Sequence, residues 1–301
     1  MNIHFSNVNF SSRSGPNTFA SRLAHELAIL GHEIVAHTDE YDIFLVFIEP
    51  ASLPRPGSKV IQRLDGIWFK PDQFYTHNHN IKWAYDHSSH VIWQSEFDKQ
   101  MTEFHWGKKT GTVIHNGVHI NQDVNIGFQF SKIREKYSRI FVSSSNWHRQ
   151  KRLKENTEFF LKNRKLDDDC LIVLGQNPDY VINDNDIYYL GDVSHDICMQ
   201  VYKIADWMIH LAWLDHCPNV VVEALSQNCA VICTDSGGTR EIVKNNGIII
   251  KENKKYNFEL TDYDYPYDLD LGVMDLPEIN VDNAYLNIKK IAQKYLRILE
   301  N

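Results

Sequence analysis

The sequence predicts an α/β protein with two Rossmann-like domains, each built around a parallel sheet. Short apolar runs of strand length alternate with segments whose apolar residues recur at helical spacing, a pattern typical of βαβ units. The alternation runs through two successive series of similar size. The chain has 301 residues, of which 43% are hydrophobic, so it is long enough for two domains of about 100–200 residues each.

The first series occupies residues 1–120. A strand at residues 2–5 leads through a polar loop at 9–17 into a helix over 18–30, whose apolar residues share one face: Phe19, Leu23, Leu27 and Leu30. Further strands are predicted at 33–38, 42–49, 59–63, 91–94 and 112–115. The polar segment 117–132 lacks clear periodicity, and we place the junction between the domains there.

The second series occupies residues 121–282. Its predicted strands are 139–143, 170–174, 187–190, 207–210 and 231–234, and its helices are 154–163, 195–205 and one that starts at Pro218. The acidic, aromatic segment 262–270 is predicted to be an irregular surface loop, and a last helix covers 283–299. Ligands of such sheets bind beyond the carboxyl ends of the strands, so we expect a site in the cleft between the domains.

Composition excludes several classes of protein. The net charge is −8 and no long basic run occurs, so we predict no nucleic-acid partner. No window approaches the roughly 18 apolar residues of a membrane helix, and the N-terminus lacks a signal-peptide pattern. The five cysteines include no CxxC pair, which predicts reduced thiols in a cytoplasmic protein. Peripheral membrane contact stays possible, because a lipid-linked acceptor would require it.

The most informative stretch is residues 214–243. It reads as a loop, an amphipathic helix, a short buried strand and a Gly-Gly turn that opens another helix. Two acidic residues, Asp215 and Glu223, lie eight apart across the loop and the first helix. Pro218 is pre-set for a helix start, where free backbone N–H groups and the helix dipole favour anions.

This stretch closely resembles the nucleotide-sugar site of retaining glycosyltransferases of GT-B fold, the family 4 or glycosyl transferases group 1 type. The resemblance implies two Rossmann-like domains facing each other across a cleft. Residues 1–120 would form the acceptor-side domain and residues 121–282 the domain that binds the nucleotide sugar. The last helix, within 283–301, would pack back on the first domain.

The resemblance also assigns roles to residues of this stretch. Glu223 would accept hydrogen bonds from the ribose hydroxyls of the nucleotide, and Asp215, where the family usually has Glu, would lie near the hydroxyls of the donor sugar. The helix start at Pro218, Asn219 and Val220 would meet the donor pyrophosphate and sugar. The alternative is that Asp215 caps the helix and that Glu223 is a solvated helix residue.

Residues 143–153 resemble a second family segment, the Gly-Arg-x(4)-Lys-Gly loop, whose Arg and Lys neutralise the leaving diphosphate. Lys151 matches the lysine, but the arginine position falls on Ser145 or Asn146. We therefore predict that Arg149 or Arg152 supplies the second charge, since cleavage of a nucleotide diphosphate without a metal needs fixed positive charge on the leaving group. The alternative is a solvated basic turn.

Two candidates lie in the first domain. Gly15 matches a Gly-rich turn that the family places close to the donor phosphate and the acceptor. Asp65 ends a predicted strand and could orient an acceptor hydroxyl, although Asp-Gly is also ordinary turn chemistry. Residues 94–97 and 115–118 resemble the family's Ser-Glu-Phe and Pro-Asn-Gly-Val segments, which mark the end of this domain.

The function that the resemblance implies is transfer of a sugar from a UDP- or GDP-linked donor to an acceptor hydroxyl, with retention and with no cofactor or metal. The acceptor could be a glycan, a lipid-linked sugar or a small molecule. The histidines lack a zinc ligand set, and the Asp-x-Asp patterns of the 262–270 loop follow no apolar strand. Neither pattern therefore predicts a metal site.

Three other functions are weighed against transfer. A nucleotide-sugar epimerase on the same fold would form product without an acceptor. A catalytically weak nucleotide-sugar-binding protein is favoured by the Asp at 215 and by the missing loop arginine. A dinucleotide-dependent oxidoreductase is disfavoured, because no G-x-G-x-x-G follows the first strand.

Overall fold

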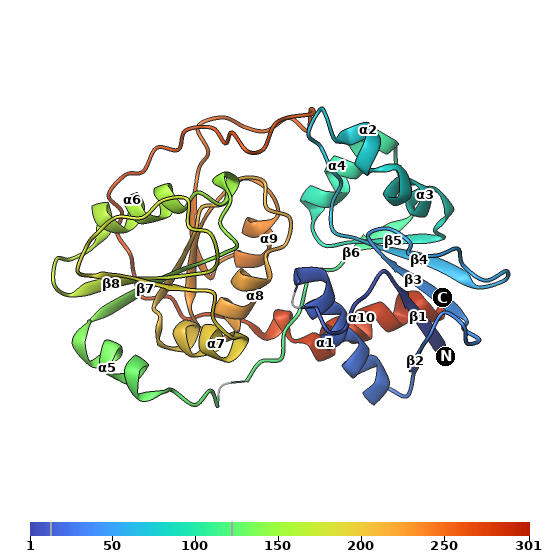
Figure 1. Cartoon of the computed structure of the whole chain (residues 1–301), viewed down its shortest axis with the longest axis horizontal. Coiled ribbons are helices and arrows are strands. Elements are labelled where there is room, and N and C mark those ends of the chain that lie inside the picture. Colours follow the sequence, from blue (N-terminus) through green and yellow to red (C-terminus); the bar gives the residue numbers. More distant parts are fainter. Residues whose placement is uncertain (13, 122) are drawn as a thin grey trace. The chain divides into compact units, whose positions relative to one another are not determined.

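The computed structural model describes residues 1–12, 14–121 and 123–301. Arg13, in the predicted 9–17 loop, and Gln122, in the predicted junction, lie outside the described residues. The chain forms two compact units (Figure 1). Unit 1 contains Met1–His119, Asn257–Asp262 and Tyr285–Asn301, and unit 2 contains Ile120–Tyr256 and Tyr263–Ala284. Which unit binds donor and which binds acceptor stays a prediction.

Unit 1 is built on a six-stranded parallel sheet of order β2-β1-β3-β4-β5-β6. Its strands are β1 (Asn2–Ser6), β2 (Glu33–Val35), β3 (Ile43–Phe47), β4 (Lys59–Leu64), β5 (His90–Trp93) and β6 (Gly111–Val113). Its helices are α1 (Gly15–Ile29), α2 (Phe74–His77), α3 (His79–His87), α4 (Glu96–Trp106) and α10 (Ile288–Glu300), the last preceded by the 3-10 helix η2 (Ala284–Leu286).

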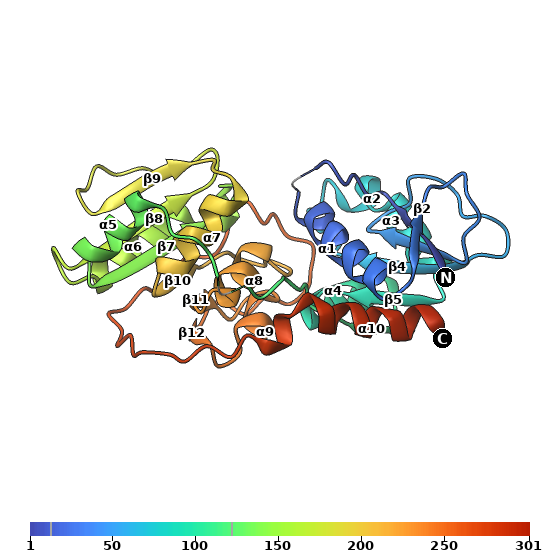
Figure 2. The same cartoon turned by 90° about the horizontal axis from the view of Figure 1, so that it is seen from below.

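Strand β3 explains how helices come to cover both faces of this sheet. It is an uninterrupted apolar run, and all of it is buried, as expected for a central strand of a parallel sheet. Ile43, Leu45 and Phe47 belong to the core that α1 and α10 share, whereas Phe44 and Val46 pack with Ala84 of α3. Because successive side chains of a strand point to opposite faces, α1 and α10 cover one face and α3 covers the other (Figure 2).

Unit 2 is built on a second six-stranded parallel sheet, of order β12-β11-β10-β7-β8-β9. Its strands are β7 (Arg139–Ser144), β8 (Asp169–Leu174), β9 (Ile187–Gly191), β10 (Trp207–His210), β11 (Ala230–Thr234) and β12 (Gly247–Ile250). Its helices are α5 (Phe128–Lys136), the 3-10 helix η1 (Arg149–Lys151), α6 (Leu153–Asn163), α7 (His195–Ile204), α8 (Asn219–Ser226) and α9 (Thr239–Val243).

The strand order of unit 2 predicts where it binds a ligand. From β7 the chain proceeds outward through β8 and β9, then returns to β10 on the other side of β7 and proceeds through β11 and β12. The order therefore reverses between β7 and β10, which pair in parallel. Ligands of doubly wound sheets bind at such a switch point, beyond the carboxyl ends of the strands. The loops that follow β7 and β10 frame this position.

The predicted α/β class with two parallel sheets is confirmed, with corrections to individual elements. Helix α1 begins at Gly15, not at residue 18, because Pro16 in its first turn needs no hydrogen-bond partner for its nitrogen. Helix α5 begins at Phe128, inside the segment predicted to be a junction. Helices α2, α3 and α4 and strand β12 were not predicted. Within the described residues, no helix is both long and apolar enough to cross a membrane.

Candidate active site

Two loops at the switch point of unit 2 bring Lys151 and Asp215 together. Lys151 ends η1, which follows β7, and Asp215 lies in the loop after β10. The Nζ atom of Lys151 is 2.6 Å from Oδ2 of Asp215, and the two side chains are only 18% and 12% exposed. The residues lie 64 positions apart in the sequence. They meet because the strands that precede them are neighbours in the sheet.

His210 completes this group. It is the last residue of β10 and is buried, and its Nε2 atom lies 3.1 Å from the same Oδ2 of Asp215. An ionised carboxylate can only accept hydrogen bonds, so in this contact Nε2 carries the proton and donates it. Sequence reasoning missed His210. The signal that could have found it is a polar residue at the carboxyl end of an otherwise apolar strand.

The two partners of Asp215 control its ionisation. Burial by itself would raise the pKa of Asp215, but the Lys151 ammonium and the hydrogen bond from His210 outweigh burial and hold the pKa well below its usual range. An unperturbed Asp has a pKa of about 3.9. Because the folded-state pKa is the lower one, the pair stabilises the folded protein above pH ~4, and this stabilisation is lost as the pH falls below that value.

We expect Asp215→Asn to flatten the acid dependence of stability. The free energy of unfolding, measured by urea denaturation between neutral pH and pH 3, should fall less steeply below pH ~4 in the variant than in the wild type. Hydrogen bonds from Arg164 lower the pKa of Asp184 in both proteins, so a shared residual slope is expected. Identical slopes in the two proteins would contradict the ion pair as described.

The Gly-Gly turn after β11 holds the backbone of Asp215. The N–H of Gly238 donates to the carbonyl oxygen of Asp215 at 2.8 Å. Gly237 has a φ of +67°, and a Cβ atom there would lie 2.3 Å from the same oxygen. Only glycine combines this conformation with so close an approach. The turn therefore supports the candidate carboxylate directly.

Helix α8 presents the other predicted residues of the 214–243 stretch. It begins at Asn219, with Pro218 at the N-cap position and Val220 in its first turn, and no described side chain caps it. Glu223, on the same helix, is buried, and its Oε1 atom lies 3.4 Å from Nε2 of His195, the first residue of α7. The alternative of a helix cap at Asp215 and a solvated Glu223 is therefore wrong.

The two candidate arginines of the loop after β7 differ sharply. Arg149 is exposed, and its guanidinium stacks 5.0 Å from the ring of Tyr265. Arg152 is buried and forms an ion pair with Glu252, with Nη1 to Oε1 at 2.6 Å. The prediction that Arg152 contacts the donor is corrected, because its guanidinium is directed to partners inside unit 2. Arg149 remains the candidate for the second positive charge.

The candidates of unit 1 occupy separate elements. Asp65 directly follows β4 and forms an ion pair with the buried Arg63. The guanidinium of Arg63 lies 4.5 Å from the ring of Phe19 in α1, and its Nη2 atom donates to Asn116 at 2.8 Å. Gly15 is the first residue of α1. The Asp65 carboxylate is thus held by a charge at the carboxyl end of its own strand, which a plain Asp-Gly turn would not require.

Two other kinds of side chain bear on the chemistry of the described residues, namely those that can ligate metals and the cysteine thiols. In the part of the chain that the structure describes, no group of three or more His, Cys, Asp and Glu side chains is placed to hold a metal ion. The cysteines are free thiols. Burial raises the pKa of Cys170 and of Cys233 to about 12, so these two thiols are protonated and unreactive near neutral pH.

Solved structures share this architecture over most or all of the chain. Anabaena Alr3699/HepE, solved in complex with UDP-glucose, matches with a TM-score of 0.68 at 15% identity, covering 100% of this chain and 99% of that chain. AviGT4, a glycosyltransferase involved in avilamycin A biosynthesis, matches with a TM-score of 0.62 at 14% identity, over 100% and 97%. WaaG, a glycosyltransferase involved in lipopolysaccharide biosynthesis, matches with a TM-score of 0.61 at 11% identity, over 85% and 87%. No curated protein sequence matches the chain.

The fold of this chain is the GT-B fold that these glycosyltransferases share. Within the chain, residues 128–259 match the family described as Glycosyl transferases group 1. These residues include Lys151, His210, Asp215 and Glu223. The predicted GT-B fold is therefore confirmed over the whole chain, and the predicted likeness to the group 1 family is confirmed over residues 128–259.

Proposed function

We propose that this protein transfers a sugar from a nucleotide diphosphate sugar to an acceptor hydroxyl, with retention at the anomeric carbon. The observation that carries the proposal is the Lys151–Asp215 ion pair at the switch point of unit 2, where doubly wound sheets bind nucleotides. A UDP-linked donor is favoured, because HepE, a structure of the same fold, was solved with UDP-glucose.

In this proposal the positive charges act on the leaving group. The bond between the anomeric carbon and the diphosphate oxygen breaks, and its electron pair passes to the diphosphate. The acceptor oxygen forms the new bond, and its proton departs with the diphosphate. An ammonium has three N–H donors, so Lys151 can hold Asp215 with one and donate to the diphosphate with another. Arg149 adds a second positive charge, so that two side chains stabilise the diphosphate in place of a metal ion.

The remaining candidates bind and orient the substrates. Asp215 accepts hydrogen bonds from hydroxyls of the donor sugar, and Glu223 accepts from the ribose. The start of α8, at Pro218, Asn219 and Val220, contacts the pyrophosphate, because a helix N-terminus attracts anions. Asp65 and Gly15 act on the acceptor side in unit 1. The acceptor is a glycan, a lipid-linked sugar or a small molecule in glycan biosynthesis.

One observation favours a second candidate, a nucleotide-sugar-binding protein with weak catalysis. The side chain of Asp215 is one methylene shorter than the Glu that the family usually has. Its carboxylate already accepts hydrogen bonds from both Lys151 and His210. A carboxylate so engaged has less capacity left for a sugar hydroxyl. Such a protein would bind the nucleotide sugar tightly but release diphosphate slowly, whether or not an acceptor is present.

A ligand panel followed by a transfer assay tests the proposal. UDP, GDP, ADP and their glucose conjugates are compared by thermal shift, where a ligand at 100 times its Kd should add about 2.7 kcal/mol of stability. The bound donor is then incubated with acceptor pools, and acceptor-dependent release of nucleotide diphosphate is expected. Binding without release supports the weak binder, release of a new sugar without acceptor supports an epimerase, and no binding to any nucleotide contradicts both the transferase and the binder.

A further inference from the structure

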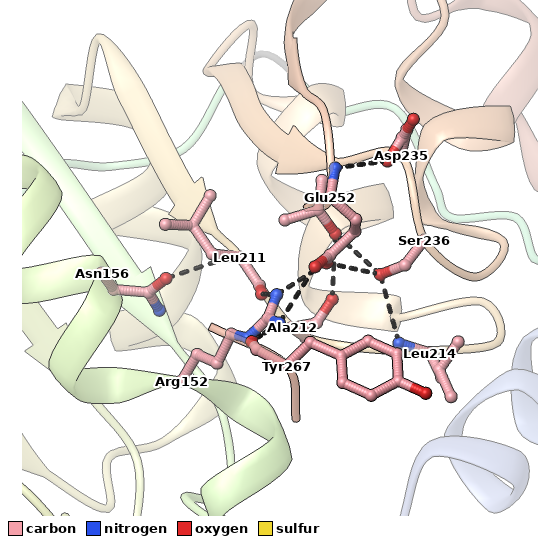
Figure 3. Close-up of polar contacts among 10 residues, drawn as sticks. Arg152, Asn156, Leu211, Ala212, Leu214, Asp235, Ser236, Glu252 and Tyr267 are labelled. Atoms are coloured by element: carbon pink, nitrogen blue, oxygen red, sulfur yellow. Dashed lines mark hydrogen bonds and ion pairs between the residues drawn. The ribbon is translucent and has the colours of Figure 1, made fainter. Parts of the chain in front are cut away.

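We propose that Glu252 is a positioning residue that holds Lys151 and Asp215 together from outside the pair. Glu252 lies just after β12, a strand that the sequence did not predict, and its side chain is only 3% exposed. Its carboxylate contacts Arg152 in the loop after β7 and Ser236 after β11, and Ser236 in turn contacts the loop of Asp215 (Figure 3). The catalytic consequence rests on the proposed function, whereas the geometry can be tested without turnover.

The first connection leads from Glu252 to the loop of Lys151. Arg152, the residue after Lys151, donates from Nη1 to Oε1 of Glu252 at 2.6 Å and from Nη2 to Oε2 at 3.0 Å. The same guanidinium donates to the carbonyl oxygens of Leu211 and Tyr267. Two parallel N–H···O bonds fix direction as well as distance. Arg152 therefore anchors the end of η1 to the segment that follows β12, the edge strand of the sheet.

The second connection leads from Glu252 to the loop of Asp215. The hydroxyl of Ser236 lies 3.0 Å from Oε1 of Glu252 and 2.8 Å from Oγ1 of Thr234. It also lies 3.4 Å from the backbone nitrogen of Leu214, the residue before Asp215. The N–H of Glu252 in turn donates to Oδ1 of Asp235 at 2.8 Å. In Figure 3 the hydroxyl of Ser236 lies between the Glu252 carboxylate and the backbone nitrogen of Leu214, and Asp235 contacts the backbone nitrogen of Glu252.

The backbone at both anchor points is strained in the same way. Arg152 has a φ of +54° and Leu214 also has a φ of +54°, although neither is glycine. The family loop that residues 143–153 resemble has a glycine after its lysine, where Arg152 stands in this chain. Non-glycine residues persist in the left-handed region only where their surroundings impose it. Both strained residues are direct neighbours of the candidate pair. Arg152 is bound by Glu252, and the backbone nitrogen of Leu214 is bound by Ser236.

Precise placement matters because the pair has to face the diphosphate and the sugar at once. A displacement of about 1 Å at a reacting group can cost about 10²-fold in rate. Glu252 touches neither Lys151 nor Asp215, so it acts only through their neighbours. Loss of its carboxylate should therefore loosen the pair and lower kcat, while KM changes little.

The test compares Glu252→Gln and Ser236→Ala with a matched control, Asp169→Asn. Asp169 is equally buried and pairs with Arg139, but it lies at the first residue of β8, at the amino end of the sheet. The three variants and the wild type are treated with a low concentration of an acetylating reagent. Mass spectrometry then gives the acetylated fraction of Lys151 divided by that of Lys154, whose side chain is 59% exposed. Steady-state kcat and KM are measured on the same proteins, and circular dichroism gives the folded fraction.

We expect Ser236→Ala and Glu252→Gln to raise the acetylation of Lys151 relative to Lys154. Both should lower kcat by about ten- to hundredfold with little change in KM. Asp169→Asn should change neither the acetylation ratio nor kcat. Ser236→Ala keeps the test valid if Glu252→Gln fails to fold, since it leaves the buried ion pair in place. Acetylation of Lys151 at the wild-type ratio in the folded variants would overturn the inference. A wild type without transfer activity would refute the proposed function alone, because the acetylation ratio still reports the geometry.

Discussion

Replacing Lys151 with methionine is expected to remove most transfer activity, lowering kcat by about 10²–10³-fold. The estimate follows from the loss of one fixed donor, on a side chain only 18% exposed, aimed at developing charge. Methionine keeps much of the apolar volume of the lysine stem but carries no donor. If Lys151 acts mainly in the transition state, kcat and kcat/KM should fall by similar factors. Initial rates over a range of donor concentration measure both.

The same substitution should also destabilise the protein, because it leaves the carboxylate of Asp215 buried without its cation. Breaking a buried pair by removing one partner costs about 3–5 kcal/mol, and the partial exposure of both side chains places this case toward the lower end. A second change, Asp215→Asn, removes the orphaned charge. The double variant should recover much of the lost stability and none of the lost activity.

The double variant therefore separates catalysis from folding. The wild type, the two single variants and the double variant form a double-mutant cycle. The free energy of unfolding, measured by urea denaturation, and kcat, measured on folded protein, give two independent readings of that cycle. A role confined to structure would make both quantities recover together in the double variant. A Lys151→Met protein that retains kcat within a few-fold of wild type would remove the lysine from the proposed mechanism.

The two parallel sheets could be predicted because most of their β-strands are short apolar runs between polar loops. The strand at residues 207–210 was predicted with the bounds that β10 has. Short elements and elements with a weak apolar pattern were harder to predict from the sequence. Helix α2 has four residues, with no buried residue to give it an apolar face. Helix α5 was missed because its only buried described residue is Phe130.

The site was predicted in part for a similar reason. Lys151, Asp215 and Glu223 stand at spacings that a local motif can reveal. His210 and Glu252 acquire their roles from the pairing of strands that are distant in sequence, which no local pattern contains. Arg152 was misassigned because charge at a loop is visible in sequence, whereas the direction of the side chain depends on Glu252, 100 positions later.

Replacing Glu223 with alanine is expected to weaken nucleotide binding by about 1.5–3 kcal/mol, the usual value of a hydrogen bond to a charged group. This corresponds to a rise in Kd of about 10- to 150-fold. Isothermal titration with the nucleotide diphosphate identified by the ligand panel gives the Kd directly. His195→Ala serves as the control, because it removes the contact of Glu223 with the 51% exposed His195 but keeps the Glu223 carboxylate.

A modified ligand makes this prediction specific to the ribose. If Glu223 binds the ribose hydroxyls, the dideoxynucleoside diphosphate, which lacks both hydroxyls, should bind the wild type as weakly as the natural nucleotide binds Glu223→Ala. The alanine variant should then bind both ligands alike, because the partner of the hydroxyls is already gone. A variant that still discriminates between the two ligands by the wild-type factor would show that the hydroxyls are bound elsewhere. Glu223 would in that case act through His195 or through the packing of α8 on α7, and the ribose contact would have to be sought among other residues of unit 2.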